Sequence, residues 1–115
     1  MKILNVVDKQ LEAYNERNIK DFVGCYSNDK KAYLLESNKL ISDGKKQLEK
    51  SMKESFNSNA NAKTKLMARI TQNNLIIDHE EITNYSGGKT VKTVAVYEVI
   101  NDLITKIWFG GRTVE

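Results

Sequence analysis

Residues 75–112 of this 115-residue chain, LIIDHEEITNYSGGKTVKTVAVYEVINDLITKIWFGGR, decide its fold. Three segments of the stretch are rich in Val, Ile, Thr and aromatic residues, as β-strands are. They are separated by Gly87-Gly88 and Asn101-Asp102, which are pairs of the kind found in two-residue hairpin turns. The stretch therefore predicts three antiparallel strands joined by two tight turns.

The first of these strands carries the acidic run Asp78-His79-Glu80-Glu81, which includes the only histidine of the chain. A charged side chain within a strand must face water or line a cavity, because burying an unpaired charge costs several kcal/mol or shifts its pKa. Strand alternation divides the run, with Asp78 and Glu80 on one face and His79 and Glu81 on the other.

If both turns are two residues long, the residues that lie opposite one another in the three predicted strands can be assigned over the whole stretch. One predicted face then collects Asp78, Glu80, Ile82, Ala95, Tyr97, Val99, Lys106, Trp108 and Arg112. The other collects Ile77, His79, Glu81, Val94, Val96, Glu98, Ile107 and Phe109. Small-molecule pockets combine aromatic rings with a few polar groups, so we expect the Trp108 face to line a cavity. A single β-bulge would reverse this assignment.

The residues before this stretch predict helices first and strands later. Apolar residues three or four apart predict helices, and turn formers separate the segments. The expected elements are a helix at 2–16, a helix at 19–26 with Asn18 as its N-cap, a turn at 27–29, strands at 31–36 and 39–42, a helix at 44–56 and a strand at 63–73. Helices followed by a run of strands indicate an α+β fold.

Length and composition indicate one globular domain over residues 1–115, with 40% hydrophobic and 29% charged residues. The net charge is +3 and the basic residues are scattered, which argues against nucleic-acid binding. The single cysteine, Cys25, excludes an internal disulfide and favours a reducing, cytoplasmic location. No segment approaches the roughly 20 apolar residues that span a bilayer, and the first residues do not form a signal peptide, so we expect no membrane association.

Three segments resemble the nuclear transport factor 2-like superfamily, also called the SnoaL-like or ketosteroid isomerase-like proteins. QLEAYNERNIKDFVGCYSND (10–29) looks like the family's first two helices, DGKKQLEKSMKESF (43–56) like its third helix, and VYEVINDLITKIWF (96–109) like its last two strands. LIIDHEEIT (75–83) also looks like a signature of a steroid isomerase-like bacterial branch. Together the likenesses span essentially the whole chain.

The resemblance implies a cone-shaped, cystatin-like α+β fold. In such a fold a strongly curved antiparallel β-sheet wraps around the N-terminal helices, and a largely apolar cavity opens at one end. It also implies a homodimer formed through the outer face of the sheet, here the predicted face of Val94, Val96, Ile107 and Phe109. Family members include isomerases, cyclases, dehydratases, hydrolases and non-catalytic binding modules, so the fold alone does not decide the function.

Two acids are the candidate catalytic residues. Asp78 and Glu80 on one face would raise at least one carboxyl pKa, which is a route to a general acid or base near neutral pH. Tyr14 and Tyr97 would orient a ligand carbonyl by hydrogen bonding. The alternative is that both acids lie at the sheet edge and pair with Lys92, Lys106 or Arg112, because structural networks also perturb carboxyl groups.

Three further residues are candidates for contact with a ligand. Trp108 could stack on a flat molecule, Arg112 shares its predicted face, and His79 could shuttle protons because its ordinary pKa is near 6.5. We expect neither a metal nor a cofactor. With one histidine, a metal site would need Cys25 or carboxylates from distant segments, and the glycine pairs lack the following helix of a phosphate loop.

The steroid isomerase mechanism transfers poorly to this sequence. In an ungapped alignment the tyrosine of the first helix falls at Gln10, the aspartate base near Leu34 and the second aspartate near Ala95, with Glu36 as a displaced base. Two functions therefore stay open. One is an acid–base enzyme of the isomerase, cyclase or hydrolase kind that acts on a small apolar, carbonyl-bearing molecule. The other is a non-catalytic ligand-binding or protein-association module of the same fold.

Overall fold

Three helices and six strands follow one another in the computed structural model, which describes residues 4–115. They are α1 (Leu4–Glu16), α2 (Ile19–Gly24), β1 (Tyr26–Leu34), β2 (Leu40–Asp43), α3 (Lys45–Ser58), β3 (Lys63–Gln72), β4 (Leu75–Tyr85), β5 (Lys89–Ile100) and β6 (Leu103–Val114). The predicted α+β order is confirmed. Residues 2–3 of the first predicted helix lie outside the described residues.

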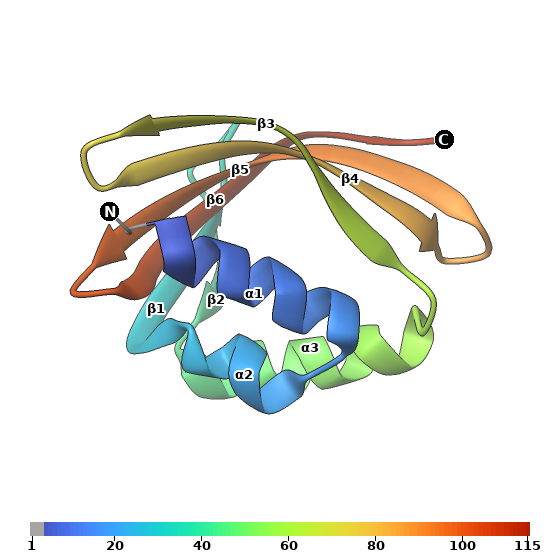
Figure 1. Cartoon of the computed structure of the whole chain (residues 1–115), viewed down its shortest axis with the longest axis horizontal. Coiled ribbons are helices and arrows are strands. Elements are labelled where there is room, and N and C mark those ends of the chain that lie inside the picture. Colours follow the sequence, from blue (N-terminus) through green and yellow to red (C-terminus); the bar gives the residue numbers. More distant parts are fainter. Residues whose placement is uncertain (1–3) are drawn as a thin grey trace.

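The strands form one sheet in the order β2-β1-β6-β5-β4-β3. All neighbours are antiparallel except β1 and β6, which run parallel, so the sheet is mixed. Figure 1 shows the sheet curving over α1, with α2 and α3 on the far side of that helix. The concave face of the sheet and the three helices therefore enclose the interior of the molecule.

The helices form where the sequence pattern predicts them, except that α2 ends at Gly24 and Tyr26 belongs to β1. Val7 and Ala13 of α1 are buried, as the apolar spacing requires. Asn18 caps α2, because its Oδ1 accepts a hydrogen bond from the backbone N–H of Asp21 at 3.1 Å. The predicted turn at 27–29 is wrong, since these residues belong to β1.

The two predicted hairpin turns differ in outcome. Asn101 and Asp102 form the expected two-residue turn, with φ of 53° and 64° at the two positions. The turn at Gly87-Gly88 is longer than predicted, because Tyr85 pairs with Lys89 and three residues lie between them. A register shift between Ile82 and Tyr85 adds a second residue, so the predicted register between β4 and β5 is wrong by two residues.

A shift of two residues keeps the side chains on their predicted faces, since strand side chains alternate with a period of two. Asp78 opposes Ala95 and Glu80 opposes Thr93, and all four side chains are buried on the inner face. The division of the acidic run by strand alternation is thus confirmed. His79 lies exposed on the outer face.

A β-bulge reverses the predicted faces of β6. Glu98 pairs with Lys106 but Val99 pairs with Ile104, so Thr105 is an extra residue on β6. Beyond the bulge Ala95 opposes Phe109 instead of the predicted Trp108. The inner face therefore receives Ile107 and Phe109, and Trp108 turns outward.

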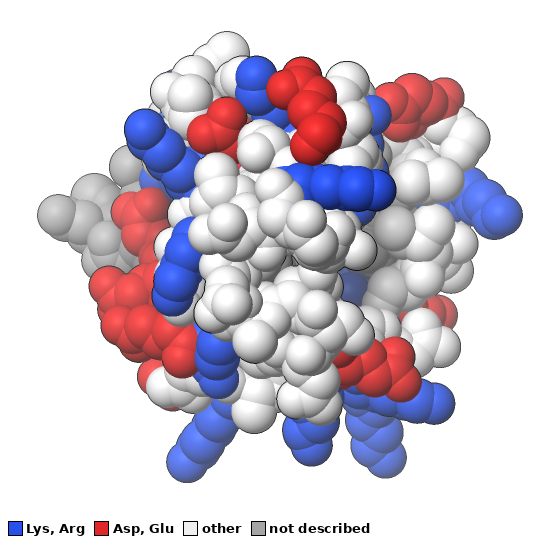
Figure 2. Space-filling model, turned by 90° about the vertical axis from the view of Figure 1, so that its right-hand side faces the viewer, with Lys and Arg blue, Asp and Glu red and all other residues white. Residues whose placement is uncertain are grey.

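Charges are spread over the surface seen in Figure 2, where basic and acidic side chains alternate around an uncharged centre. No helix within residues 4–115 is both long and apolar enough to cross a membrane.

Candidate functional site

A cavity of about 320 Å³ lies between the concave face of the sheet and the helices. Every helix and strand that the structure describes contributes to its wall. The lining residues are Gln10, Leu11, Tyr14, Phe22, Tyr26, Lys30, Ala32, Ile41, Ser42, Leu48, Ser51, Met52, Thr64, Glu80, Ile82, Tyr97, Ile107 and Phe109. Most are apolar or aromatic, as is usual for a small-molecule pocket.

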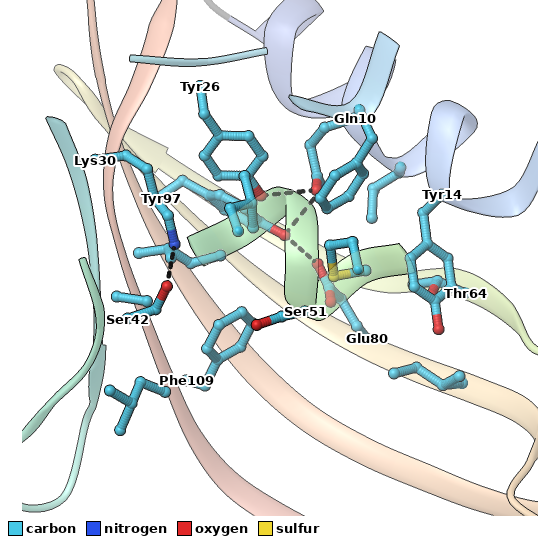
Figure 3. Close-up of a pocket in the computed structure, with 18 residues that line it drawn as sticks. Gln10, Tyr14, Tyr26, Lys30, Ser42, Ser51, Thr64, Glu80, Tyr97 and Phe109 are labelled. Atoms are coloured by element: carbon cyan, nitrogen blue, oxygen red, sulfur yellow. Dashed lines mark hydrogen bonds between the residues drawn. The ribbon is translucent and has the colours of Figure 1, made fainter. Parts of the chain in front are cut away.

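Glu80 is the acidic group of this cavity. Its side chain projects from β4 and the residue is only 5% exposed. The Tyr97 hydroxyl donates a hydrogen bond to Glu80 Oε2 at 2.7 Å. This contact occupies one carboxyl oxygen, and Figure 3 shows the carboxyl group among the cavity side chains.

A chain of hydrogen bonds leads to Glu80 from the first strand (Figure 3). The Tyr26 hydroxyl donates to Gln10 Oε1 at 3.0 Å, and Gln10 Nε2 donates to the Tyr97 hydroxyl at 3.2 Å. Tyr97 in turn donates to Glu80. Each donor points toward the next acceptor, so the chain presents the carboxylate with a single, fixed donor.

Burial raises the pKa of Glu80 to about 7, because the apolar surroundings disfavour the charged form. The Tyr97 hydrogen bond opposes this increase, the negative charge of Asp78 adds to it, and the positive charge of Arg69 opposes it. A carboxyl group with a pKa near neutrality can both accept and donate a proton at physiological pH.

Asp78 has a different environment, although it lies two residues from Glu80 on the same face. Arg69 of β3 binds it through two hydrogen bonds, Nε to Oδ1 at 2.6 Å and Nη2 to Oδ2 at 2.9 Å. Arg69 also donates to Asp8 of α1 at 2.7 Å. Asp78 is fully buried and is not among the cavity-lining residues. Its carboxylate therefore ties the sheet to α1.

Lys30 is a second ionisable group of the cavity wall and is 1% exposed. Its Nζ donates to Ser42 Oγ at 3.1 Å and lies 5.8 Å from the centre of the Tyr26 ring. Burial lowers the pKa of Lys30 to about 8, and the charge of Asp43 partly opposes the decrease. Figure 3 shows Lys30 and Ser42 on the opposite side of Tyr97 from Glu80.

The predicted ligand-binding residues divide into two groups. Tyr14 and Tyr97 line the cavity, as predicted. Trp108, Arg112 and His79, the other three predicted ligand-binding residues, do not line the cavity. The bulge in β6 turns Trp108 outward. Strand alternation in β4 places His79 on the outer face.

Each of these three residues has surroundings of its own. The Trp108 ring stacks on Tyr33 with ring centres 5.6 Å apart and donates from Nε1 to Asn38 at 3.2 Å. The Arg112 guanidinium lies 5.3 Å from the centre of the Tyr85 ring. His79 is exposed. Within residues 4–115 no group of three or more His, Cys, Asp or Glu side chains is arranged to hold a metal.

No family model and no curated protein matches the sequence. Solved structures do match it. A cystatin-fold protein of Novosphingobium aromaticivorans superposes with a TM-score of 0.85 at 16% identity, over 95% of this chain and 97% of the other. A nuclear transport factor 2-like protein of unknown function from Cytophaga hutchinsonii superposes with a TM-score of 0.78 at 12% identity, over 100% of this chain and 91% of the other. A SnoaL-like protein of unknown function from Burkholderia thailandensis superposes with a TM-score of 0.72 at 12% identity, over 90% of this chain and 88% of the other.

The chain has the nuclear transport factor 2-like fold. This confirms the predicted cone-shaped, cystatin-like architecture. Because the sequence identities are low, the structural likeness establishes the fold and nothing about function. The positions that the ungapped alignment matched with isomerase residues carry side chains of a different kind in this structure. Gln10 belongs to the hydrogen-bond chain, Leu34 is exposed, and Ala95 is buried without a polar group. Glu36, the displaced candidate base, is exposed and accepts from the Gly111 N–H at 2.7 Å.

The polar residues of the site that were not predicted from the sequence include Gln10, Tyr26 and Lys30. Gln10 lies one residue before Leu11 on the helix face that packs inward, and Tyr26 begins β1 instead of ending a helix. Lys30 shares its strand face with Ala32, a pattern hidden by the turn formers at 27–29. A strand beginning at Tyr26 would have placed Tyr26, Lys30 and Ala32 on one face.

Proposed function

We propose that this protein binds a small apolar, carbonyl-bearing molecule in the cavity and that Glu80 moves a proton on it. The observation that carries the proposal is the position of Glu80, a carboxyl group in an apolar wall with its pKa raised to about 7. The nearest established type of chemistry is proton abstraction next to a carbonyl group, followed by return of the proton.

The geometry favours Glu80 over Asp78 for this role. Arg69 occupies both oxygens of Asp78, whereas Tyr97 occupies one oxygen of Glu80. The second oxygen of Glu80 accepts no hydrogen bond from the residues that the structure describes. In the proposed step, Glu80 takes a proton from the carbon next to the carbonyl, the C–H electron pair forms the enolate, and the protonated Glu80 returns the proton to carbon.

The Tyr97 hydroxyl has a supporting role in this proposal. It accepts from Gln10 and donates to Glu80, so its single hydrogen is already engaged. Tyr97 therefore positions the carboxyl group and limits the rise of its pKa. Tyr14 lies at the cavity wall beside Phe56, with ring centres 5.6 Å apart, and is the tyrosine left to face a ligand.

A non-catalytic binding module is the second candidate function. It is favoured by the residues at the isomerase-matched positions, because Leu34 and Ala95 carry no group that could act on a proton. The cavity would then hold its ligand without turnover. Both functions require the cavity to take up an apolar molecule, and they differ in whether the Glu80 proton is exchanged with the ligand.

Hydrogen–deuterium exchange separates the two functions. Cyclohexanone and decalone are incubated with the protein in deuterated buffer, and loss of the protons next to the carbonyl is followed by NMR. The proposal predicts exchange by the wild type and a reduction of roughly 10²- to 10⁴-fold in Glu80→Gln. Glu81→Gln on the outer face is the matched control and should exchange like the wild type. Ketones that bind without exchange would support the binding module instead.

A further inference from the structure

Lys30 is a buried cation that forms no salt bridge with a carboxylate of the described residues 4–115. Its Nζ contacts Ser42 Oγ, and within residues 4–115 no carboxylate oxygen lies within 4.0 Å of it. The Asp43 carboxylate is instead bound by the exposed Lys31, at 2.8 Å. A buried ammonium group normally pairs with an acid or loses its charge, because its desolvation is costly.

The surroundings of Lys30 hold its ammonium group at the cavity wall. The backbone carbonyl of Lys30 accepts from the Gly44 N–H at 2.8 Å, which fixes this part of β1 beside the start of α3. The Tyr26 ring and Ser42 lie on either side of the ammonium. An ammonium has three donors, and Ser42 uses one of them. The other two have no acceptor among residues 4–115, and Lys30 lines the cavity.

Ser42 adds a donor to the same place. Its Oγ accepts the hydrogen bond from Lys30, so the hydroxyl keeps its own hydrogen to donate. An ammonium and a hydroxyl that converge on one point match the two oxygens of a carboxylate. The rest of the wall is mostly apolar and aromatic, so such a ligand must also have an apolar body.

We infer that the cavity takes an apolar carboxylic acid as its carboxylate, with the carboxylate against Lys30 and Ser42 and the apolar body extending past Tyr97 toward Glu80. This inference rests on the proposed function, in that the same cavity must hold the ligand, and it names the class of molecule. Figure 3 shows the required arrangement, with Lys30 and Ser42 on one side of Tyr97 and Glu80 on the other.

The two ends of the cavity then have separate tasks. Lys30 recognises the charged end, and Glu80 meets a part of the ligand away from it. At a pH of about 6, below the pKa of about 8 for Lys30 and of about 7 for Glu80, the lysine is charged and most of the glutamic acid is neutral. A carboxylate ligand is attracted by the first group under these conditions and is not repelled by the second.

Isothermal titration calorimetry at a pH of about 6 tests the inference with naphthoate and its neutral amide, naphthamide. The wild type should bind naphthoate about 10-fold or more tightly than naphthamide, since a charge-assisted hydrogen bond accounts for at least that ratio. Lys30→Met should abolish this preference and leave naphthamide affinity within about 2-fold. Lys31→Met, a change of the neighbouring exposed lysine, should alter neither affinity.

Two further variants keep the test decisive. Ser42→Ala should weaken the binding of naphthoate by about 3- to 10-fold, in the same direction as Lys30→Met. Because this variant keeps the lysine, it can be used if Lys30→Met does not fold. Glu80→Gln should keep the preference for naphthoate. A failure of the proton-transfer proposal is seen separately, as ketone exchange by Glu80→Gln at the rate of the wild type. Failure of naphthoate to bind, equal affinities for the acid and the amide, or equal weakening of both by Lys30→Met would overturn the inference.

Discussion

Arg69 binds Asp78 with two hydrogen bonds, whereas Glu80, two residues along the same strand face, has no basic partner among residues 4–115. The two acids therefore have opposite properties. Asp78 is an anchor between β3, β4 and α1, and Glu80 is a carboxyl group in an apolar cavity with its pKa raised to about 7. The candidate acid–base group is defined by this difference.

Glu80 should make the stability of the protein depend on pH. Its folded-state pKa of about 7 lies above the ordinary value of 4.5, so the folded state holds the proton more tightly than the unfolded state. This stabilisation is complete below the ordinary pKa and is lost as pH rises through about 7, at a cost of about 3 kcal/mol. Urea unfolding of the wild type and Glu80→Gln at several pH values measures it. The curves of the two proteins should diverge with rising pH, and parallel curves would contradict the assignment.

Lys30 should produce a dependence of the opposite sign at higher pH. Burial lowers its folded-state pKa to about 8 from 10.5, so the folded state binds its proton less tightly than the unfolded state. The resulting destabilisation is present below a pH of about 8 and is relieved as the pH approaches 10.5. Lys30→Met should therefore raise the midpoint of thermal unfolding at neutral pH. A lowered midpoint, with Lys31→Met unchanged as control, would mean that the ammonium stabilises the empty cavity.

Tyr97→Phe should raise the pKa of Glu80 above about 7, because the Tyr97 hydrogen bond opposes the effect of burial. The ring is retained, so the packing of a residue that is only 2% exposed changes little. Carboxyl carbon NMR of the glutamate side chains follows the titration directly. Tyr33→Phe, a change of the tyrosine that stacks on Trp108, is the control and should leave the Glu80 titration unaltered.

Arg69→Met should be strongly destabilising, by about 3–5 kcal/mol, since it leaves the Asp78 carboxylate buried and unpaired. The same change should raise the pKa of Glu80, because the positive charge of Arg69 lowers it. Asp8→Asn is the matched control. The Asp8 side chain is 55% exposed, so losing its contact with Arg69 should cost less than about 1 kcal/mol in chemical unfolding.

Gly110→Ala should destabilise the junction of β1 and β6. A Cβ at this position would lie 2.7 Å from the Leu35 Cβ, and Leu35 also donates its N–H to the Phe109 carbonyl at 2.7 Å. We expect a loss of about 1–3 kcal/mol, typical of overpacking. Gly24→Ala, where a Cβ meets nothing within 4 Å, should leave stability nearly unchanged in the same unfolding assay.

The sequence predicts those parts of the structure that local patterns determine. Apolar spacing sets the helices, and Asn101-Asp102 sets the last hairpin, because its two positive φ angles suit these residues. The bulge at Thr105 could not be predicted in this way. A bulge depends on how β6 fits between β1 and β5, and one extra residue exchanges the faces of Trp108 and Phe109.

The candidate site was predictable in part, and its acid was found because charge stands out within a strand. Glu80 was found by that signal, whereas Lys30 was missed because lysine is almost always exposed and its strand begins with turn formers. The partner of Asp78 was also missed. Arg69 lies on β3, and its pairing with Asp78 depends on the register between two strands joined by a turn.

The pKa of Glu80 in the wild-type protein is the most direct test of the proposed function. Carboxyl carbon NMR, with the resonance assigned by its loss in Glu80→Gln, should give a titration midpoint of about 7. A midpoint near the ordinary value of 4.5 would show a solvated carboxylate and contradict the role of Glu80 as the acid–base group of an apolar cavity.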